Sequence, residues 1–169
     1  MGRWQERTAV LLGEATLDSL AAKRVMVVGL GGVGAYAAEM LCRAGIGNLV
    51  LIDSDTVGES NLNRQLIALN STIGKLKTDV LAERLKDINP AVNLVVVPEY
   101  VEEENLPRIF ETAGKLDYVV DAIDTLAPKI SLIKHCVQNG IPHVTAMGAG
   151  AKLDATKIRI ADLSKSYNC

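Results

Sequence analysis

Four closely spaced glycines near the start of the chain have the spacing of a phosphate-binding loop. Residues 25–55 read VMVVGLGGVGAYAAEMLCRAGIGNLVLIDSD. Gly29, Gly31 and Gly34 have the G-x-G-x-x-G spacing, which makes a tight turn, lets the backbone approach a phosphate, and brings helix and strand into contact. Gly32 adds a fourth glycine to the loop. The amino end of the next helix suits an anion, so the loop predicts a nucleotide site.

Two aspartates, Asp53 and Asp55, follow the next aliphatic run. Asp53 stands after the second predicted strand, where a carboxylate can accept hydrogen bonds from ribose hydroxyls. An acidic residue there disfavours a ribose 2′-phosphate, so NADP is not expected. We place both aspartates among the nucleotide-binding candidates. This fingerprint indicates a nucleotide, but it does not distinguish NAD from ATP.

Polar and basic residues follow Asp53 in a pattern that favours a triphosphate over hydride transfer. Asn61, Asn63 and Arg64 come soon after it, and Lys77 opens a predicted helix. An arginine fork and a lysine point charge could offset the charge of a triphosphate and of a leaving pyrophosphate. The ordinary structural interpretation makes Arg64 a surface ion-pair partner and Lys77 a solvated helix residue.

Asp124 ends the predicted strand in VVDAIDT and is the candidate metal ligand. In open α/β sheets, ligands bind at the carboxyl ends of the strands. Mg²⁺ takes oxygen ligands and usually only one or two protein carboxylates, so one aspartate here could hold it against phosphates. The alternative role for Asp124 is an N-cap of the following helix. Asp121 is expected to be a structural acid at the strand end.

Apolar runs alternate with helical patterns along the chain. This alternation predicts an α/β fold: a Rossmann-like, doubly wound, mostly parallel sheet with helices on both faces. N-terminal helices precede it, and late strands could pair antiparallel at the C-terminal end. Strands are expected at 24–30, 48–55, 92–98, 117–124, 143–150 and 157–163, and helices at 7–23 (one or two), 33–44, 76–88, 105–113 and 128–138.

Length and composition limit the class of protein. The 169 residues fit one domain, with nearly half of them apolar and a formal net charge of −2. The charge argues against a general nucleic-acid coat, and no apolar run approaches the ~20 residues that span a bilayer. Cys42, Cys136 and Cys169 are far apart, which favours a reducing cytoplasm. Because the sequence stops after a predicted strand, we expect it to be part of a longer protein.

Five ordered motifs resemble one superfamily. GLGGVG, LIDSDTV, NRQ, GKLK and DAID are similar to ThiF, MoeB, HesA and the ubiquitin-activating enzymes, which join a carboxylate to AMP. Within that superfamily, the chain most resembles the tRNA threonylcarbamoyladenosine dehydratases. The stretches that carry this closer resemblance are RTAVLLGEATLDSLAAKRVMVVGLGGVG, NLNRQ, DAIDTLAPK and GAGAKLDATKIRIADLSK. The resemblance implies ATP-dependent activation of the threonyl carboxylate, followed by cyclisation of this modified nucleoside in tRNA.

The resemblance also implies roles for matching residues. Gly32 would approach the nucleotide, Asp53 would hold the ribose, and Asp124 would bind Mg²⁺. Arg7 matches an arginine that reaches across a homodimer into the partner's ATP site, which the residue pattern alone does not predict. The implied catalytic set is Arg7, Arg64, Lys77 and Asp124, with Asn61 among the phosphate contacts. The implied partners are a second copy, tRNA, and a sulfur-transfer or cysteine desulfurase protein.

Three other interpretations stay open at this point. An activator of a ubiquitin-like sulfur carrier shares the chemistry as far as the adenylate but transfers a protein Gly-Gly terminus. An NAD-dependent dehydrogenase would need only the glycine loop and Asp53. A non-catalytic scaffold would need neither Arg64 nor Lys77. Cys169 could begin a zinc-binding Cys-x-x-Cys pair, but SKSYN before it resembles the dehydratases, so we do not expect zinc.

Overall fold

The computed structural model describes residues 3–167. None of the helices in this range is long and apolar enough to cross a membrane. The helices are α1 (Glu6–Leu12), α2 (Glu14–Ala22), α3 (Gly34–Ala44), α4 (Lys77–Ile88), α5 (Leu106–Ala113) and α6 (Leu126–Gln138), and the strands are β1 (Arg24–Val28), β2 (Asn48–Ile52), β3 (Asn93–Val97), β4 (Tyr118–Asp121) and β5 (His143–Thr145). Short 3-10 turns lie at Arg3–Gln5, Glu59–Asn61, Ala155–Lys157 and Leu163–Lys165.

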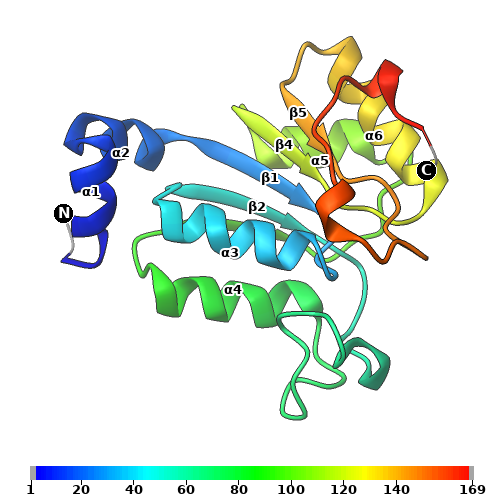
Figure 1. Ribbon diagram of the computed structural model, residues 1–169, viewed down its shortest axis with the longest axis horizontal. Coiled ribbons are helices and arrows are strands. Elements are labelled where there is room, and N and C mark those ends of the chain that lie inside the picture. Colours follow the sequence, from blue (N-terminus) through cyan, green and yellow to red (C-terminus); the bar gives the residue numbers. More distant parts are fainter. Residues whose placement is uncertain (1–2, 168–169) are drawn as a thin grey trace.

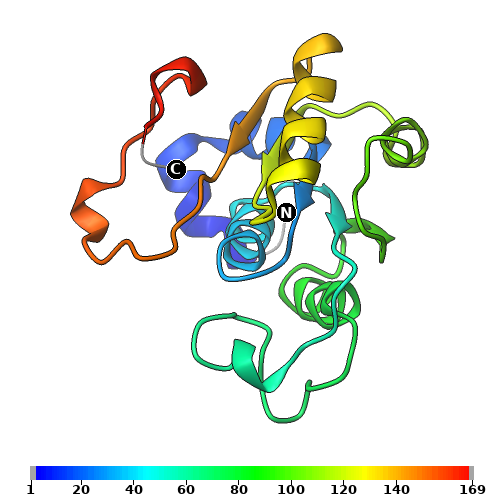
Figure 2. The ribbon, with the colours of Figure 1, turned by 90° about the vertical axis from the view of Figure 1, so that its right-hand side faces the viewer.

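The five strands form a parallel sheet in the order β3-β2-β1-β4-β5. Central β1 pairs with β2 on one side and β4 on the other, so Val27 lies opposite both Leu51 and Val120. The strand order reverses between β1 and β4, and such switch points are where open α/β sheets bind ligands. All five strands end at one edge, on the right of Figure 1 and facing the viewer in Figure 2.

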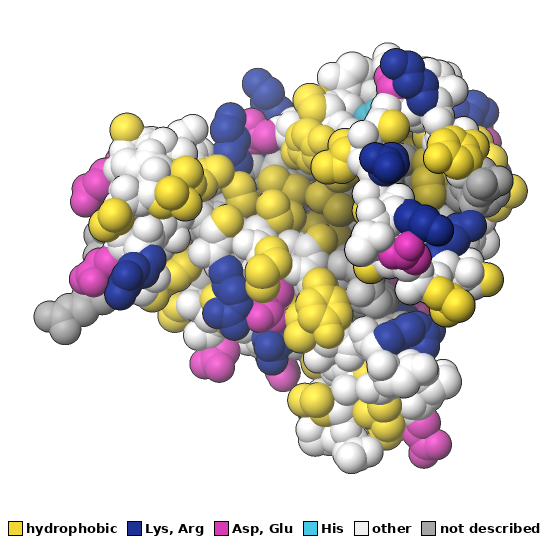
Figure 3. Space-filling view, viewed as in Figure 1, with side chains coloured by type: hydrophobic (Ala, Val, Ile, Leu, Met, Phe, Trp, Pro, Cys, Tyr) yellow, Lys and Arg dark blue, Asp and Glu magenta, His cyan; other side chains and the backbone are white. Residues whose placement is uncertain are grey.

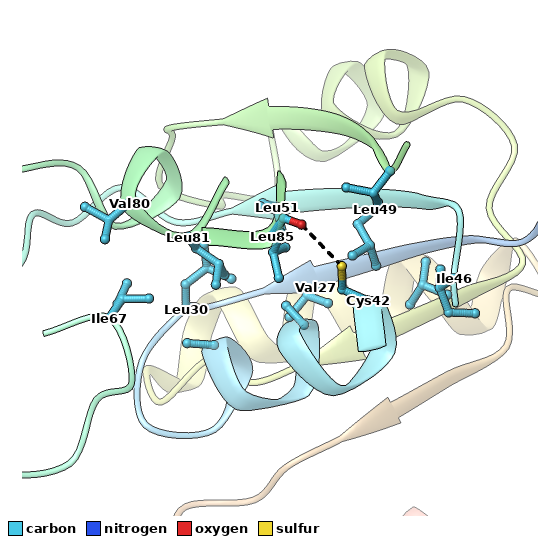
Figure 4. Packing of buried hydrophobic residues seen from close by; sticks show 14 of the residues in the cluster. Val27, Leu30, Cys42, Ile46, Leu49, Leu51, Ile67, Val80, Leu81 and Leu85 are labelled. Carbon is cyan, nitrogen blue, oxygen red and sulfur yellow. Dashed lines mark hydrogen bonds between the residues drawn. The ribbon is translucent and has the colours of Figure 1, made fainter. Parts of the chain in front are cut away.

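Helices cover both faces of the sheet, as the sequence predicts. α3 and α4 lie on one face and α5 and α6 on the other (Figure 2). Alternate residues of β1 therefore enter different cores: Val27 packs under α3 and α4, whereas Met26 packs under α5 and α6. Figure 4 shows the first core, where the Cys42 thiol of α3 approaches the Leu85 carbonyl of α4 at 3.6 Å. The doubly wound α/β prediction is confirmed.

The N-terminal helices pack at the amino ends of the strands, away from the carboxyl edge (Figure 1). A Cβ on Gly47, just before β2, would lie 1.9 Å from the Ala21 carbonyl oxygen of α2. A Cβ on Gly45, where φ is +102°, would lie 2.6 Å from Gln5 Nε2. These two glycines therefore allow α2 and the turn before α1 to contact the α3–β2 connection.

The expected C-terminal strands are wrong in part. β5 ends at Thr145 instead of continuing to residue 150, and no strand forms at 157–163 within the described part of the chain. Ile158 and Ile160 are 79% and 99% exposed, so their apolar alternation has no sheet neighbour to pack against. A strand needs a paired edge to satisfy its backbone groups, and this segment extends outward from the sheet without pairing (Figure 2).

Candidate nucleotide-binding and active site

The glycine loop connects β1 to α3, and two of its positions have no room for a side chain. Gly29 has a φ of +84°, and a Cβ there would lie 2.7 Å from the Ala122 carbonyl oxygen. A Cβ on Gly34 would lie 1.7 Å from the Gly29 carbonyl oxygen. By contrast, a Cβ on Gly31 or Gly32 would meet only ordinary contacts of 3.5 Å or more. The fold thus requires the outer two glycines, and the inner two leave backbone open to solvent.

Asp53 closes the loop from β2. Its Oδ2 accepts a 2.6 Å hydrogen bond from the Leu30 backbone N–H in the glycine loop, and its Oδ1 accepts one of 2.8 Å from the Asp55 N–H. Each carboxylate oxygen can accept more than one hydrogen bond, so both keep capacity for ribose hydroxyls. The structure therefore places Asp53 beside the loop, where a ribose-binding acid belongs.

Lys77 is buried, which neither interpretation of the sequence predicted. Its side chain is 6% exposed and its Nζ lies 2.7 Å from Asp55 Oδ2, whose side chain is 65% exposed. The Lys77 backbone N–H also bonds the Asp55 carbonyl, which fixes the start of α4 against the end of β2. The solvated-helix interpretation is wrong, because a buried ammonium needs a partner and Asp55 supplies it.

The loop between β2 and α4 carries the remaining polar candidates. Asn61 Oδ1 accepts a 3.0 Å bond from the Gly58 N–H, which leaves its amide group as a donor. The exposed Arg64 guanidinium donates to the Ser60 carbonyl at 3.0 Å and to Asn63 Oδ1 at 2.9 Å. Within residues 3–167 Arg64 forms no ion pair. The surface ion-pair interpretation is therefore wrong.

The loop with Arg64 lies against the glycine loop. A Cβ on Gly32 would lie 3.7 Å from Arg64 Cγ, and one on Gly31 would lie 3.5 Å from Gln65 Nε2. Gln65 is 8% exposed, and its buried Oε1 has no hydrogen-bond partner. A buried acceptor without a partner is rare, so Gln65 is a residue of interest that the sequence candidates omitted.

Asp124 lies exposed in the β4–α6 connection. The Thr125 hydroxyl donates a 3.3 Å hydrogen bond to its Oδ1. The N-cap interpretation is wrong, since Thr125 holds that position and α6 has no side-chain cap. Ala122, two residues earlier, contacts Gly29, so the β1 and β4 connections are neighbours.

Asp121, in contrast, is a structural acid as expected. It is 1% exposed and forms a buried ion pair with Lys129 of α6, with 2.7 Å between Oδ2 and Nζ. Lys129 was not among the sequence candidates. A lysine inside an apolar helical run, such as KISLIKHCV, was the available signal.

Arg7 does not join this site within one chain. It lies on α1, exposed, at the amino-terminal end of the sheet, whereas the glycine loop lies at the carboxyl edge (Figure 1). A contribution from Arg7 thus requires a second copy of the chain.

The described cysteines are poor nucleophiles. Cys42 and Cys136 are buried and free, and Cys169 lies outside the described residues. Burial raises the pKa of Cys42, and burial together with the nearby Asp121 charge raises the pKa of Cys136 to about 11. The thiolate is the reactive form, so both stay inert at neutral pH.

The donor set fits a magnesium nucleotide. α3 begins without a side-chain cap or an acid in its first turn, so its amino end is open to a phosphate. Asp124 offers an oxygen that a cation could share with phosphates, whereas the Asp121 oxygens are already hydrogen-bonded. Across residues 3–167, no group of three or more His, Cys, Asp or Glu could hold a metal by itself. A Mg²⁺ ion here would therefore need substrate oxygens, as it commonly does.

The fold and this edge define a Rossmann-like nucleotide-binding protein, and the comparison with known families specifies it. The ThiF family pattern matches residues 5–169. The chain belongs to the ThiF family.

Two similar curated proteins carry the same name. The chain is 44% identical to the tRNA threonylcarbamoyladenosine dehydratase of Escherichia coli (strain K12) over 96% of its own length and 61% of the relative. It is 42% identical to the Bacillus subtilis (strain 168) protein of that name, over 95% and 63%. The crystal structure of the E. coli enzyme TcdA in complex with ATP matches with a TM-score of 0.92 and 43% identity, covering 98% of this chain and 69% of that one. The chain thus spans about three fifths of the length of these curated relatives.

Proposed function

We propose that residues 1–169 form the ATP-binding adenylation domain of an enzyme that activates a carboxylate. The observation that carries the proposal is convergence at one sheet edge. An open helix N-terminus, a ribose-binding acid, two cations and an exposed carboxylate meet where β1, β2 and β4 end. Such convergent polar groups at a switch point are what a magnesium triphosphate requires.

The proposed substrate is threonylcarbamoyladenosine in tRNA, supported by the shared name of the relatives. A threonyl carboxylate oxygen attacks the α-phosphorus of ATP, the bond to the bridging oxygen breaks, and pyrophosphate leaves. A nitrogen of the same modified side chain then attacks the acyl carbon, loses its proton, and displaces AMP as the ring closes. Because both reacting ends belong to one side chain, no protein nucleophile is needed. The inert cysteines agree with that route.

The residues at the edge have separate tasks. Arg64 and Lys77 offset charge that builds on the phosphates, and the Asn61 amide and the α3 N–H groups donate to phosphate oxygens. Asp53 orients the ribose, and Asp55 orients Lys77. Asp124 would hold Mg²⁺, which would supply positive charge to offset the phosphates and the leaving pyrophosphate.

We propose that two copies form a homodimer in which Arg7 of one protomer enters the site of its partner. Figure 3 shows hydrophobic side chains lining a hollow between the N-terminal helices and the C-terminal segment. α3 and the β4–β5 side of the sheet leave Tyr36, Met40, Tyr118 and Val144 between 39% and 53% exposed. A large apolar face of this kind is typical of an interface.

Further proposals rest on the family resemblance. They are a sulfur-transfer or cysteine desulfurase partner and a cytoplasmic location, the latter supported by two described cysteines that are free.

The deciding experiment incubates full-length protein with ATP and tRNA that carries threonylcarbamoyladenosine. Nucleoside mass analysis should show the loss of one water from that nucleoside. Asp124→Ala should abolish the loss and also ATP–pyrophosphate exchange. Glu103→Ala, which removes an exposed carboxylate before α5, should keep both and serves as the control.

Other outcomes would identify a different protein. Exchange that depends on a carrier with a Gly-Gly terminus, without change in tRNA, would support the sulfur-carrier activator. Thermal stabilisation by NAD but not by Mg-ATP would support a dehydrogenase. Full exchange by Asp124→Ala would defeat the metal assignment.

A further inference from the structure

A buried ion pair lies at the end of β4, just before the connection that carries the candidate metal ligand Asp124. Lys129 is 5% exposed, and its Nζ donates to Asp121 Oδ2 at 2.7 Å, to the Ala146 carbonyl at 2.9 Å and to Thr145 Oγ1 at 3.1 Å. An ammonium has three N–H donors, so all of them are used. One side chain of α6 thereby holds the last residues of both β4 and β5.

Asp121 is equally saturated. Its Oδ1 accepts a 3.0 Å bond from the Ile123 N–H, and its Oδ2 accepts from Lys129 and from the Thr145 hydroxyl. The Ile123 bond reaches into the connection that carries Asp124. Asp121 is thus closed to a cation but fixes the backbone one residue before Asp124.

The same connection is held from the opposite side by the glycine loop. The Ala122 N–H donates to the Val28 carbonyl at 2.8 Å, and the Ala122 carbonyl oxygen lies 2.7 Å from the position that a Gly29 Cβ would take. Asp124 itself is exposed and has one hydroxyl contact, so its own bonds do little to hold it. Its position depends on the two residues before it.

Stability alone gives a weak reason for this pair. Removing two charges from water costs about as much as their attraction returns, and apolar residues of similar volume are often as stable. What an ion pair adds is fixed geometry, because each of its bonds has a set direction and length.

We propose that Lys129 and Asp121 are positioning residues that hold Asp124 at the distance from the glycine loop that a nucleotide-bound cation requires. The inference rests on the proposed function. Side chains that orient metal ligands typically alter metal affinity by about 10- to 100-fold when mutated. Losing Lys129 should therefore weaken the metal more than the nucleotide.

The test compares Lys129→Met with Lys134→Met, an exposed lysine on the same helix, in the full-length protein. Calorimetry measures the affinity for AMP without metal and the Mg²⁺ concentration that half-saturates binding of a non-hydrolysable ATP analogue. We expect Lys129→Met to raise that concentration about tenfold and to change the AMP affinity less than twofold. Lys134→Met should match the wild type in both.

A second variant covers the case in which Lys129→Met does not fold. Thr145→Val removes the hydrogen bond that this hydroxyl donates to Asp121 and the one that it accepts from Lys129, but it leaves the ion pair. It should therefore shift the Mg²⁺ requirement in the same direction by less. Equal losses of AMP and Mg²⁺ binding, or an unchanged Mg²⁺ requirement in folded variants, would overturn the positioning role. If the wild type itself binds no magnesium nucleotide, the proposed function fails instead.

Discussion

Lys77 and Asp55 form an ion pair whose two side chains differ strongly in solvent exposure. The lysine side chain is 6% exposed and the aspartate side chain 65% exposed. A charge that keeps its water can lose its partner cheaply, whereas a buried charge cannot. Removing the buried lysine and removing the exposed aspartate should therefore affect stability differently. This difference allows an experiment to distinguish a structural role for Lys77 from a phosphate-binding role.

Removing either member should lower stability, but by unequal amounts. Asp55→Ala leaves a buried ammonium unpaired, so we expect a loss of about 1–3 kcal/mol in the free energy of unfolding. Lys77→Met leaves a hydrated carboxylate and should cost less than about 1 kcal/mol. Urea unfolding measures both, with Lys75→Met as the exposed control.

Lys77→Met should nevertheless weaken ATP binding strongly, because a charge-assisted bond to phosphate is lost. A Lys77→Met protein that unfolds more easily than Asp55→Ala and still binds ATP normally would show that Lys77 serves the fold.

At the scale of single residues, the sequence identified the candidate residue types better than it predicted their contacts. Arg64 was chosen because it follows the glycine loop, and it lies beside Gly32. Lys77 was chosen for the same reason, and it pairs with Asp55. The burial of Lys77 could not be predicted, since it depends on Asp55 and on how the start of α4 is held after β2, which no local pattern encodes.

The glycine loop is an element in which two kinds of glycine do different work. Gly34 lies in the first turn of α3 against the Gly29 carbonyl, while Gly32 is exposed beside the Arg64 side chain. A methyl group at the first position collides with backbone, and one at the second occupies space open to a ligand.

Gly34→Ala should therefore destabilise the fold by about 3 kcal/mol or more, because a Cβ 1.7 Å from an oxygen forces backbone to move. Gly32→Ala should change stability by less than about 0.5 kcal/mol. It should weaken ATP at least about tenfold, or 1.4 kcal/mol, by crowding the phosphate approach.

Thermal unfolding and ATP titration of the two variants provide the comparison, each acting as the other's control. Normal ATP affinity in Gly32→Ala would place the phosphates elsewhere on the sheet edge.

Helices and strands that are set by hydrophobic periodicity or by local steric limits were predicted well. β1, α3, β2 and α4 agree with expectation to within a few residues. The predicted strand at 157–163 failed because a strand also needs a neighbour, and an alternating pattern does not say whether one exists.

At the scale of the whole molecule, Arg7 lies at the end of the sheet opposite the glycine loop. Any catalytic role of Arg7 therefore depends on dimer formation. If Arg7 acts in the partner's site, two inactive variants should complement each other. Arg7→Ala retains its own Asp124, and Asp124→Ala can lend its Arg7, so one of the two sites in a mixed dimer is intact.

Random exchange between equal amounts of the two variants should restore about a quarter of the wild-type exchange activity, because half the dimers are mixed and half of their sites are intact. ATP–pyrophosphate exchange before and after subunit mixing measures it. Mixtures as inactive as either variant alone would place Arg7 outside the partner's site.

The sequence by itself determined the βαβ alternation, the turn at Gly29 and Gly34, and the presence of acids and cations after consecutive strands. These features follow from side-chain periodicity and from local steric limits, which act over a few residues. Only the tertiary structure decided that Lys77 is buried on Asp55, that Lys129 supports the Asp124 connection, and that Arg7 lies at the far end. Those facts depend on pairings between distant segments, whose energies appear only once the sheet brings the segments together.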